Sequence, residues 1–477
     1  MDKKFYVTTP IYYVNDAPHV GSAYTTLAAD IISRYYRLKL GDKNVFFLTG
    51  TDEHGQKIAQ SAKENNLTPI EFADSIVPKF KEAWKLLNIN YDYFIRTTDL
   101  KHEKVASDLL QKIYDNGYIY EGTYEGPYCI GCERFYKESE LVDNRCPLHP
   151  NKEISHQKEK NYFLKLKELV EEKVLPAIKS GEYQILPEFR KNEILSRIEQ
   201  GIEDVSVSRE GVSWGIPVPW DKSQTIYVWV EALMNYYSAT QFLEGKKDFW
   251  PADLHLMAKD ILWFHAVIWQ ALLFAADLPL PKTIYAHGFF TIDGQKMSKS
   301  LGNVITPKQL VDRYGVDGAR YLLISAVSFG SDGDISLKDF DTKYNADLAN
   351  GIGNLVARVA KLCEMDSIEG IKNYSSDLEN LKQLLGAYFI NIEKYEFSIA
   401  LEEIWREIKK LDQDITTYEP WNKTKEERSG YLNKYVKRIL GIADIVKPFL
   451  PKTAEKIEKQ FTGPEIKSSD PLFPRLS

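Results

Sequence analysis

Three cysteines and one histidine stand at spacings that suit a metal ion. Cys129 and Cys132 are separated by two residues, and thirteen residues later Cys146 and His149 repeat this separation. Ligand pairs of this kind can close a tetrahedron of three thiolates and one imidazole around zinc. Because all four positions are then filled, we expect one structural zinc ion with no open place for a substrate or water.

Two polar segments far apart in the chain carry groups that suit phosphate. Pro18, His19 and Gly21 lie in a loop that opens a helical pattern, so backbone amides and the helix dipole can face an anion. Much later, the run 296–300 (Lys-Met-Ser-Lys-Ser) offers two ammonium groups and two hydroxyls that can hold a triphosphate. Each segment alone has an ordinary alternative, since His19 can cap the helix and the lysine pair can sit in a solvated surface loop.

The pattern around the first segment predicts the element that positions it. Phe5 to Thr9 and Val45 to Leu48 are apolar runs typical of buried strands, and apolar residues recur at helical spacing from Leu27 to Tyr36. Strand, helix and strand in this order predict a βαβ unit of a parallel sheet, whose ligands bind beyond the carboxyl ends of the strands. The segments His19–Ser22 and Asp52–Gly55 each follow one of these strands, so we expect both at that edge.

The rest of the chain predicts an interruption of the sheet and a helical end. From about residue 116 to 224 the βαβ rhythm lapses, and it resumes with Ile226 to Val230, Leu254 to Ala258 and Ile284 to Ala286. After about Asp341 apolar residues keep to helical phase, which predicts a helix bundle. The expected fold is therefore α/β, with a nucleotide-binding parallel sheet split by an insertion and followed by an all-α part.

Composition narrows the class of protein further. The chain has 477 residues, of which 44% are apolar and 13% aromatic, enough for several cores. Its four cysteines are too few for a disulfide framework, and its formal charge of −7 argues against an indiscriminate polyanion binder. No run approaches the roughly 18 apolar residues of a membrane helix, and no signal-like segment opens the chain, so we expect a cytoplasmic protein with no membrane partner.

Taken together and in this order, the two polar segments resemble the HIGH and KMSKS signatures of class I aminoacyl-tRNA synthetases. Further runs look like the methionyl-tRNA synthetase family in particular, and the resemblance covers essentially the whole chain. These runs are Thr9 to Tyr13, Thr49 to Gly55, Gly211 to Gly215 and Tyr227 to Ala232.

One position departs from the family pattern. Ser22 stands where the HIGH signature ends in a second histidine. A hydroxyl can donate to ribose or phosphate, but it supplies no positive charge. Stabilisation of the phosphates therefore shifts toward His19, Lys296 and Lys299.

The resemblance implies a domain order and an activity. It implies a Rossmann-like catalytic domain in residues 1–115 and 226–300, a connective insertion in 116–225 with its zinc knuckle at about 122–155, a stem-contact region in 301–345 and a helical anticodon-binding domain in 346–477. It implies ATP-dependent formation of methionyl-adenylate and transfer of methionine to tRNA(Met), with Mg²⁺ accompanying ATP. The dimerising domain appended to longer relatives is missing after the last helix, so we expect a monomer.

The resemblance also assigns roles to individual residues. Asp52 takes the substrate's ammonium group, although a strand-end aspartate can equally serve a turn or a helix cap. Aromatic pocket walls suit a thioether because sulfur is polarizable, but without the resemblance these side chains would be interpreted as ordinary core. The catalytic and ATP-binding residues are expected to be His19, Gly21, Ser22, Arg209, Asp260, His287, Lys296, Ser298 and Lys299, and the methionine pocket Ile11, Tyr13, Asp52, Trp229, Ala232, Leu233, Tyr236, Phe264 and His265.

In the helical part, Asn354, Arg358 and Trp421 match the family's anticodon-reading positions. An amide, a planar guanidinium and an indole can stack on and read unpaired bases. Each also has a structural alternative: an interface hydrogen bond, a solvated charge and a side chain packed under a loop. Candidate phosphate contacts are Lys434, Lys437 and Arg438.

Two other functions fit parts of this pattern. Synthetases for leucine, isoleucine or valine share the class, but they generally need a large editing insertion, and the span available here is short. A tRNA-binding scaffold that has lost catalysis would keep the fold, but the presence of His19, Asp52, Lys296 and Lys299 speaks against it. The histidines at 102, 156 and 255 receive no role from the sequence.

Overall fold

The computed structural model describes residues 3–131, 134–136, 138–292, 294–297, 303–372, 374 and 385–476. The chain divides into two compact units, each assembled from separate segments. The first comprises Met1–Pro18, Leu40–Glu82 and Asn90–His287, and the second comprises His19–Lys39, Ala83–Ile89 and Gly288–Ser477. Within the described residues, no helix is both long enough and apolar enough to cross a membrane.

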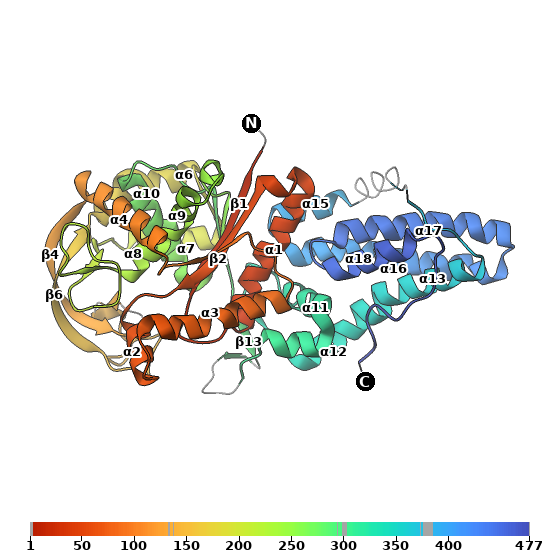
Figure 1. The fold of residues 1–477 in the computed structure, drawn as a ribbon, viewed down its shortest axis with the longest axis horizontal. Helices are drawn as coiled ribbons and strands as arrows, with labels where there is room; N and C mark the ends of the chain where they lie inside the picture. The colour runs from red at the N-terminus through yellow and green to blue at the C-terminus, as the bar shows by residue number, and fades with distance from the viewer. Residues whose placement is uncertain are drawn as a thin grey trace. The chain divides into compact units, whose positions relative to one another are not determined.

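A six-stranded parallel sheet forms the centre of the first unit (Figure 1). The strand β1 lies between a neighbour from the N-terminal part of the chain and one that follows the insertion, so the strand order reverses at β1. Open parallel sheets bind ligands at such a reversal, outside the carboxyl ends of the strands. The order across the sheet is β3 (Tyr93–Arg96), β2 (Val45–Asp52), β1 (Phe5–Tyr13), β11 (Leu254–Ala258), β12 (Thr283–His287) and β7 (Gln184–Leu186). The split parallel-sheet fold expected from the sequence is confirmed.

The helices of the first unit pack apolar stripes against this sheet. In α4 (Leu100–Asp115), the Asp99 side chain accepts a hydrogen bond from the Lys101 backbone at 2.9 Å and caps the helix. Ala106, Leu110 and Ile113 then recur at helical spacing and are fully buried. The other helices are α2 (Gln56–Glu64), α5 and α6 joined by a π-helical turn (Leu166–Leu169, Val170–Val174, Leu175–Ser180), α7 (Glu188–Glu199), α8 (Val228–Leu233), α9 (Asn235–Phe242) and α10 (Trp269–Ala275), which follows a π-helical turn at Phe264–Ile268. Helix α3 (Pro69–Leu86) contributes residues to both units.

A second sheet, antiparallel, lies within the segment expected to be an insertion. Its long strands β4 (Ile119–Cys129) and β6 (Ser155–Leu164) pair along their whole length, with β5 (Arg134–Phe135) and β8 (Val205–Ser206) at the edges. The connection between β4 and β6 carries the expected metal ligands. β7 also falls within this segment, yet it pairs with β12 in the parallel sheet.

The strand predicted at Ile226 to Val230 is wrong. Only Thr225–Ile226 (β10) is extended, and it pairs antiparallel with β9 (Ser208–Arg209) outside the main sheet, while α8 follows from Val228. Val228, Val230 and Leu233 are all buried, so the helix is apolar on more than one side. A short apolar run of this kind has no period that separates a strand from a buried helix.

The second unit is mainly helical, as expected for the C-terminal part (Figure 1). Helix α1 (Val20–Leu40) belongs to it except for its last residue, and a small sheet is built from β14 (Gln295–Lys296), β13 (Phe290–Ile292) and β15 (Gly333–Asp334). Among its described residues, the further helices are α11 (Pro307–Ser325), α12 (Leu337–Lys343), a π-helical segment at Tyr344–Gly353, α13 (Asn354–Met365), α15 (Gly386–Glu393), α16 (Phe397–Tyr418), α17 (Lys425–Val446) and α18 (Pro451–Phe461).

A buried arginine ties several parts of the second unit together. Arg320 on α11 is 0% exposed, pairs with Asp30 of α1 at 2.7 Å, and donates to the carbonyls of Pro448, Phe449 and Leu87 at 2.8 to 3.0 Å. These bonds satisfy the guanidinium where water cannot reach it. Helix α1 is thereby joined to α11 and to the end of α17.

Candidate active site

A β-bulge in β1 sets the direction of the side chains at its carboxyl end. Thr8 pairs with Leu48 of β2, but Ile11, three residues later, pairs with Gly50, so β1 contains one extra residue. The extra residue falls at Thr9-Pro10, where proline has no N–H to give to the ladder. Beyond the bulge, Ile11 and Tyr13 are only partly buried, unlike the fully buried start of the strand. The bulge therefore places two predicted pocket residues at the accessible end of the sheet.

Asp52 ends the neighbouring strand β2 and is paired in register with Tyr13. Its side chain is 3% exposed. Burial raises the pKa of Tyr236, and the nearby Asp52 carboxylate adds to this rise, so the two side chains share one environment. A carboxylate in such a place can receive a substrate's ammonium group.

Tyr236 and His265 form a hydrogen-bonded pair beside Asp52. The Tyr236 hydroxyl lies 2.7 Å from His265 Nε2, and His265 Nδ1 lies 3.0 Å from the carbonyl oxygen of Ile261. Because a carbonyl only accepts, Nδ1 carries the proton and Nε2 accepts from the tyrosine. Burial lowers the pKa of His265 to about 4, so this wall of the site is uncharged at neutral pH.

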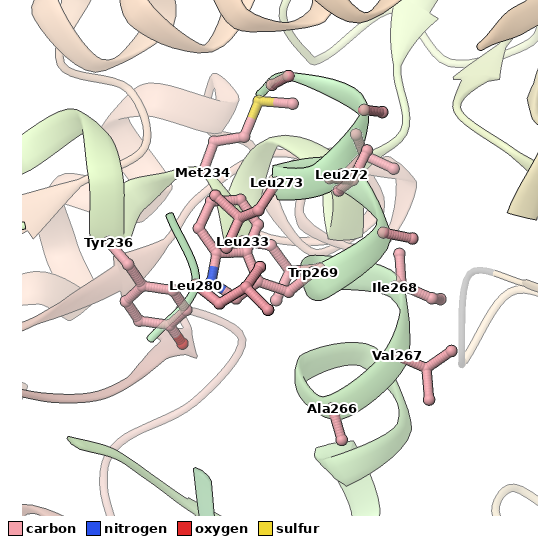
Figure 2. Close-up of a cluster of buried hydrophobic side chains, with 14 of the residues drawn as sticks. Leu233, Met234, Tyr236, Ala266, Val267, Ile268, Trp269, Leu272, Leu273 and Leu280 are labelled. Carbon is pink, nitrogen blue, oxygen red and sulfur yellow. The ribbon is translucent and has the colours of Figure 1, made fainter. Parts of the chain in front are cut away.

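The aromatic pair Trp229 and Phe264 forms another wall. Their rings are stacked with centroids 4.2 Å apart and planes 15° from parallel. Trp229 projects from α8, as do Ala232 and Leu233, and Phe264 begins the π-helical turn before α10. Figure 2 shows Tyr236 at one side of the buried cluster that backs this site, with Leu233, Trp269 and Leu273 among its members.

All nine residues expected for the methionine pocket belong to the first unit: three end β1 and β2, and the others lie in α8, in α9 and in the π-helical turn before α10. Three further residues of the first unit, Glu231, His54 and His102, received no role from the sequence. Glu231 of α8 is 0% exposed and is bonded to His54, in the loop after β2, and to His102 of α4. The one sequence signal for this cluster was a glutamate inside the apolar run 228–234. A charged side chain in such a run indicates a buried partner, because charged side chains are almost never fully buried unless paired.

Of the residues expected to bind ATP, three belong to the first unit. His287 ends β12 and is 2% exposed, while Asp260 is exposed in the turn after β11. Arg209 is 4% exposed, with its guanidinium 4.1 Å from the Tyr227 ring centroid and a hydrogen bond to the Ser206 hydroxyl at 2.9 Å. It lines a small cavity together with His54 and Trp214.

The other expected phosphate-binding residues belong to the second unit. Gly21 N–H donates to His19 Nδ1 at 3.0 Å, so the neutral imidazole carries its proton on Nε2. A Cβ at Gly21 would lie 2.8 Å from the His19 ring, which explains the glycine. Ser22 donates to the His19 carbonyl at 2.9 Å and accepts from the His19 N–H at 3.2 Å. The serine that replaces the second signature histidine thus supports the turn that presents His19.

The two signature segments approach each other within the second unit. Val20 N–H donates to the Ile305 carbonyl at 3.1 Å, and a Cβ at Gly21 would lie 3.8 Å from Met297 Cε. Ser298, Lys299 and the side chain of Lys296 lie outside the described residues.

The expected metal ligands lie together in the connection between β4 and β6. The ligand atoms of Cys129, Cys146 and His149 all lie within 4.8 Å of one another, and His149 Nδ1 is 4.0 and 3.9 Å from the two sulfurs. In a tetrahedral zinc site a sulfur and a nitrogen are about 3.6 Å apart. A Cβ at Gly131 would lie 2.7 Å from the His149 ring, so the glycine makes room for it. The residues present fit zinc, and the fourth expected ligand, Cys132, lies outside the described residues.

The three candidate anticodon residues lie on or beside packed helices of the second unit. Asn354 begins α13, and Arg358, one turn later, pairs with Asp412 of α16 at 2.6 Å. Trp421 is 48% exposed in the turn between α16 and α17, where Glu419 adopts a left-handed conformation. Arg438 is paired with Glu407 of α16.

The fold and these residues define a class I aminoacyl-tRNA synthetase. A family model described as tRNA synthetases class I (M) matches residues 5–157 and 138–360. The methionine--tRNA ligase of Caldanaerobacter subterraneus subsp. tengcongensis is 41% identical over an alignment of length 516, which covers 100% of this chain and 79% of the relative. That of Thermotoga maritima is also 41% identical, covering 98% of this chain and 77% of the relative.

Among solved structures, this chain is similar to Mycobacterium tuberculosis methionyl-tRNA synthetase in complex with methionyl-adenylate. The TM-score is 0.91 at 34% identity, with 99% of this chain and 100% of that chain covered. The chain belongs to the methionyl-tRNA synthetase family.

Proposed function

We propose that the chain activates L-methionine with ATP to methionyl-adenylate and transfers the methionyl group to tRNA(Met). The observation that carries this proposal is the site at the carboxyl ends of β1 and β2. It combines the buried carboxylate of Asp52 with uncharged aromatic walls, among them the Tyr236–His265 pair at 2.7 Å. A free amino acid with a long uncharged side chain is the substrate that such a site suits.

The chemistry of activation assigns work to cationic and hydrogen-bonding groups. The carboxylate of methionine attacks the α-phosphorus of ATP and pyrophosphate leaves, so negative charge must be aligned and stabilised. We assign the phosphates to His19 and the amides around Gly21, and the leaving pyrophosphate to Lys296 and Lys299. Ser22 keeps the His19 turn in place through its two backbone hydrogen bonds.

The remaining ATP contacts are proposed for first-unit residues. Asp260 suits the ribose hydroxyls because it is an exposed acceptor at the end of β11, and His287 suits the adenine side of the site at the end of β12. Arg209 was expected at the triphosphate, but its buried guanidinium is bonded to Ser206 and lies over Tyr227. We retain it as a candidate. Mg²⁺ prefers oxygen ligands and would be bound together with the ATP phosphates. Among the described residues, the one cluster that could hold a metal ion is Cys129, Cys146 and His149, whose sulfur and nitrogen ligands do not suit magnesium.

Selectivity for methionine follows from the charge and shape of the pocket. His265 is neutral and its Nε2 is occupied by the Tyr236 hydroxyl, so the side-chain site offers no full charge to the substrate. The rings of Trp229 and Phe264 can contact a thioether sulfur, at about 0.3–1.5 kcal/mol for each contact. A leucine side chain lacks the sulfur and is branched, so it would lose these contacts.

Two further regions would serve tRNA charging. Asn354, Arg358 and Trp421 are proposed to read the anticodon, with the exposed indole available for stacking. Cys129, Cys132, Cys146 and His149 would hold a zinc ion, which would supply a cross-link that fixes the connection between β4 and β6.

Amino-acid-dependent ATP–pyrophosphate exchange tests this proposal. We expect exchange with methionine and none above background with leucine, isoleucine or valine, followed by charging of a tRNA(Met) transcript. Exchange promoted by leucine and not by methionine would reject the substrate assignment. Binding of tRNA(Met) without exchange for any amino acid would instead identify a scaffold without catalysis.

A further inference from the structure

A buried carboxylate behind the methionine pocket holds two histidines. Glu231 Oε1 lies 2.9 Å from His54 Nδ1, and Glu231 Oε2 lies 3.0 Å from His102 Nε2. Glu231 and His102 are 0% exposed and His54 is 3% exposed. The other nitrogen of His102, Nδ1, lies 2.8 Å from the Ser238 hydroxyl of α9. One carboxylate thus joins α8, the loop after β2, α4 and, through His102, α9.

The position of Glu231 on α8 is informative. Trp229, Ala232 and Leu233 have the i, i+3, i+4 spacing of one helix face, whereas Glu231 is two residues from Trp229 and so faces the opposite way. His54 follows Asp52 by two residues. Glu231 therefore joins two parts of the pocket. It lies on the back of helix α8, whose front carries pocket residues, and it bonds to the loop that directly follows Asp52, the proposed ammonium-binding residue.

We propose that Glu231 is a positioning residue for methionine, which holds the end of β2 with Asp52 and helix α8 in one fixed geometry through His54 and His102. This inference rests on the proposed function, because it takes the pocket of Asp52 and Trp229 as the methionine site. Glu231, His54 and His102 are assigned no contact with the reacting atoms. The consequence of this inference is that methionine affinity, and not ATP affinity, depends on the charge of the Glu231 carboxylate.

The electrostatics of the cluster agree with an ion pair. Burial lowers the pKa of His54, but the Glu231 carboxylate, helped by Glu103 and Glu53, outweighs burial and leaves this pKa above its usual value. Burial raises the pKa of Glu231, but His54 and His102 outweigh it and leave this pKa below its usual range. Both shifts therefore favour a charged imidazole paired with an ionised carboxylate.

Other groups also face His54. The Glu103 carboxylate of α4 lies 3.7 Å from His54 Nε2, and 29% of the Glu103 side chain is exposed. Glu53 directly precedes His54 in the chain. Arg209 lines the same small cavity from β9, along with the tyrosines at 128 and 227. Among these groups Glu231 is hydrogen-bonded to the imidazole at 2.9 Å, so it should dominate the titration.

The expected pH dependence follows from the sign of the His54 shift. A raised pKa means that the pairing is complete below the ordinary pKa of histidine and is lost as the pH rises through the value in the folded protein. The KM for methionine should therefore rise on the alkaline side. Without the Glu231 charge, the lowering of the His54 pKa by burial is opposed by Glu103 and Glu53 but not by the largest of the three carboxylate effects, so the rise should begin at lower pH.

The test compares Glu231→Gln with the matched control Glu103→Gln in the full-length chain, by ATP–pyrophosphate exchange between pH 6 and 9. Glu231→Gln should raise the KM for methionine by roughly ten- to a hundredfold, as expected for the loss of a hydrogen bond to a charged group, with the KM for ATP within about twofold of wild type. The alkaline rise of the KM for methionine should move to lower pH. Glu103→Gln should leave both KM values near wild type.

The controls separate positioning from folding and from the proposed function. If circular dichroism shows that Glu231→Gln is unfolded, His54→Gln replaces it and should raise the KM for methionine while abolishing the alkaline rise. An unchanged KM for methionine, an equal rise of both KM values, or an unmoved pH profile would overturn the positioning role. Wild-type protein without methionine-dependent exchange would instead reject the proposed function.

Discussion

Replacement of Asp52 by asparagine isolates the charge that is proposed to bind the substrate's ammonium group. The side chain is 3% exposed at the end of β2, and asparagine keeps its size and one acceptor oxygen. Removing one partner of a buried ion pair costs about 3–5 kcal/mol. Because the amide oxygen still accepts one hydrogen bond, we take the lower limit of about 3 kcal/mol, which predicts that the KM for methionine rises by about two orders of magnitude.

A ligand that lacks the amino group turns this prediction into a double-mutant cycle. The inhibition constant of 4-(methylthio)butanoate against exchange is measured for wild type and for Asp52→Asn. This analogue has no ammonium, so the substitution should change its inhibition constant by less than about threefold, which is about 0.6 kcal/mol. Equal losses for methionine and for the analogue would refute the ammonium contact and would make Asp52 a residue of general structure.

Four further substitutions test separate parts of the site and fold. Lys299→Ala should lower exchange by about a hundredfold or more while tRNA binding, measured by filter retention, stays unchanged, because the lysine serves the phosphoryl transition state; equal losses would contradict this role. Cys146→Ser should lower the zinc content by mass spectrometry and the thermal midpoint together, and an undiminished zinc content would exclude Cys146 as a ligand. Trp421→Ala should lower kcat/KM for tRNA charging by an amount equivalent to about 1–3 kcal/mol, the value of stacking one base on an aromatic ring, and should leave ATP–pyrophosphate exchange unchanged. A parallel loss of exchange would show that Trp421 serves folding. Arg320→Met should lower the free energy of unfolding by about 3–5 kcal/mol in urea titrations, since it removes one of the cations paired with the buried Asp30, which keeps Arg34 at 2.8 Å, and the donor of three backbone carbonyls; a loss below about 1 kcal/mol would show that these Arg320 contacts are dispensable.

The sequence predicted those strands whose apolar runs are bounded by turn signals. Leu254 to Ala258 was expected and observed as β11 with the same ends, and β1 and β2 began where their runs begin. β3 and β7 were not predicted, because they have four and three residues and lie among polar neighbours. The prediction for Ile226 to Val230 was wrong because burial on more than one side of α8 removes the periodicity on which such a prediction depends.

Local spacing predicted the candidate site only where the ligands are close in sequence or belong to a family signature. The paired cysteines and histidine of the zinc knuckle are an example of the first kind. The Glu231–His54 bond joins residues 177 positions apart, and the Asp30–Arg320 pair joins different segments of the chain. No spacing rule relates such residues, because they meet only when the sheet and helices have assembled.

The most direct test of the account is to detect the adenylate itself. The protein is incubated with ATP, Mg²⁺, pyrophosphatase and all twenty amino acids without tRNA, and the bound aminoacyl-adenylate is identified by mass spectrometry. We predict methionyl-adenylate in wild type and its loss in Asp52→Asn at limiting methionine. A different aminoacyl-adenylate in the wild-type site would contradict the account.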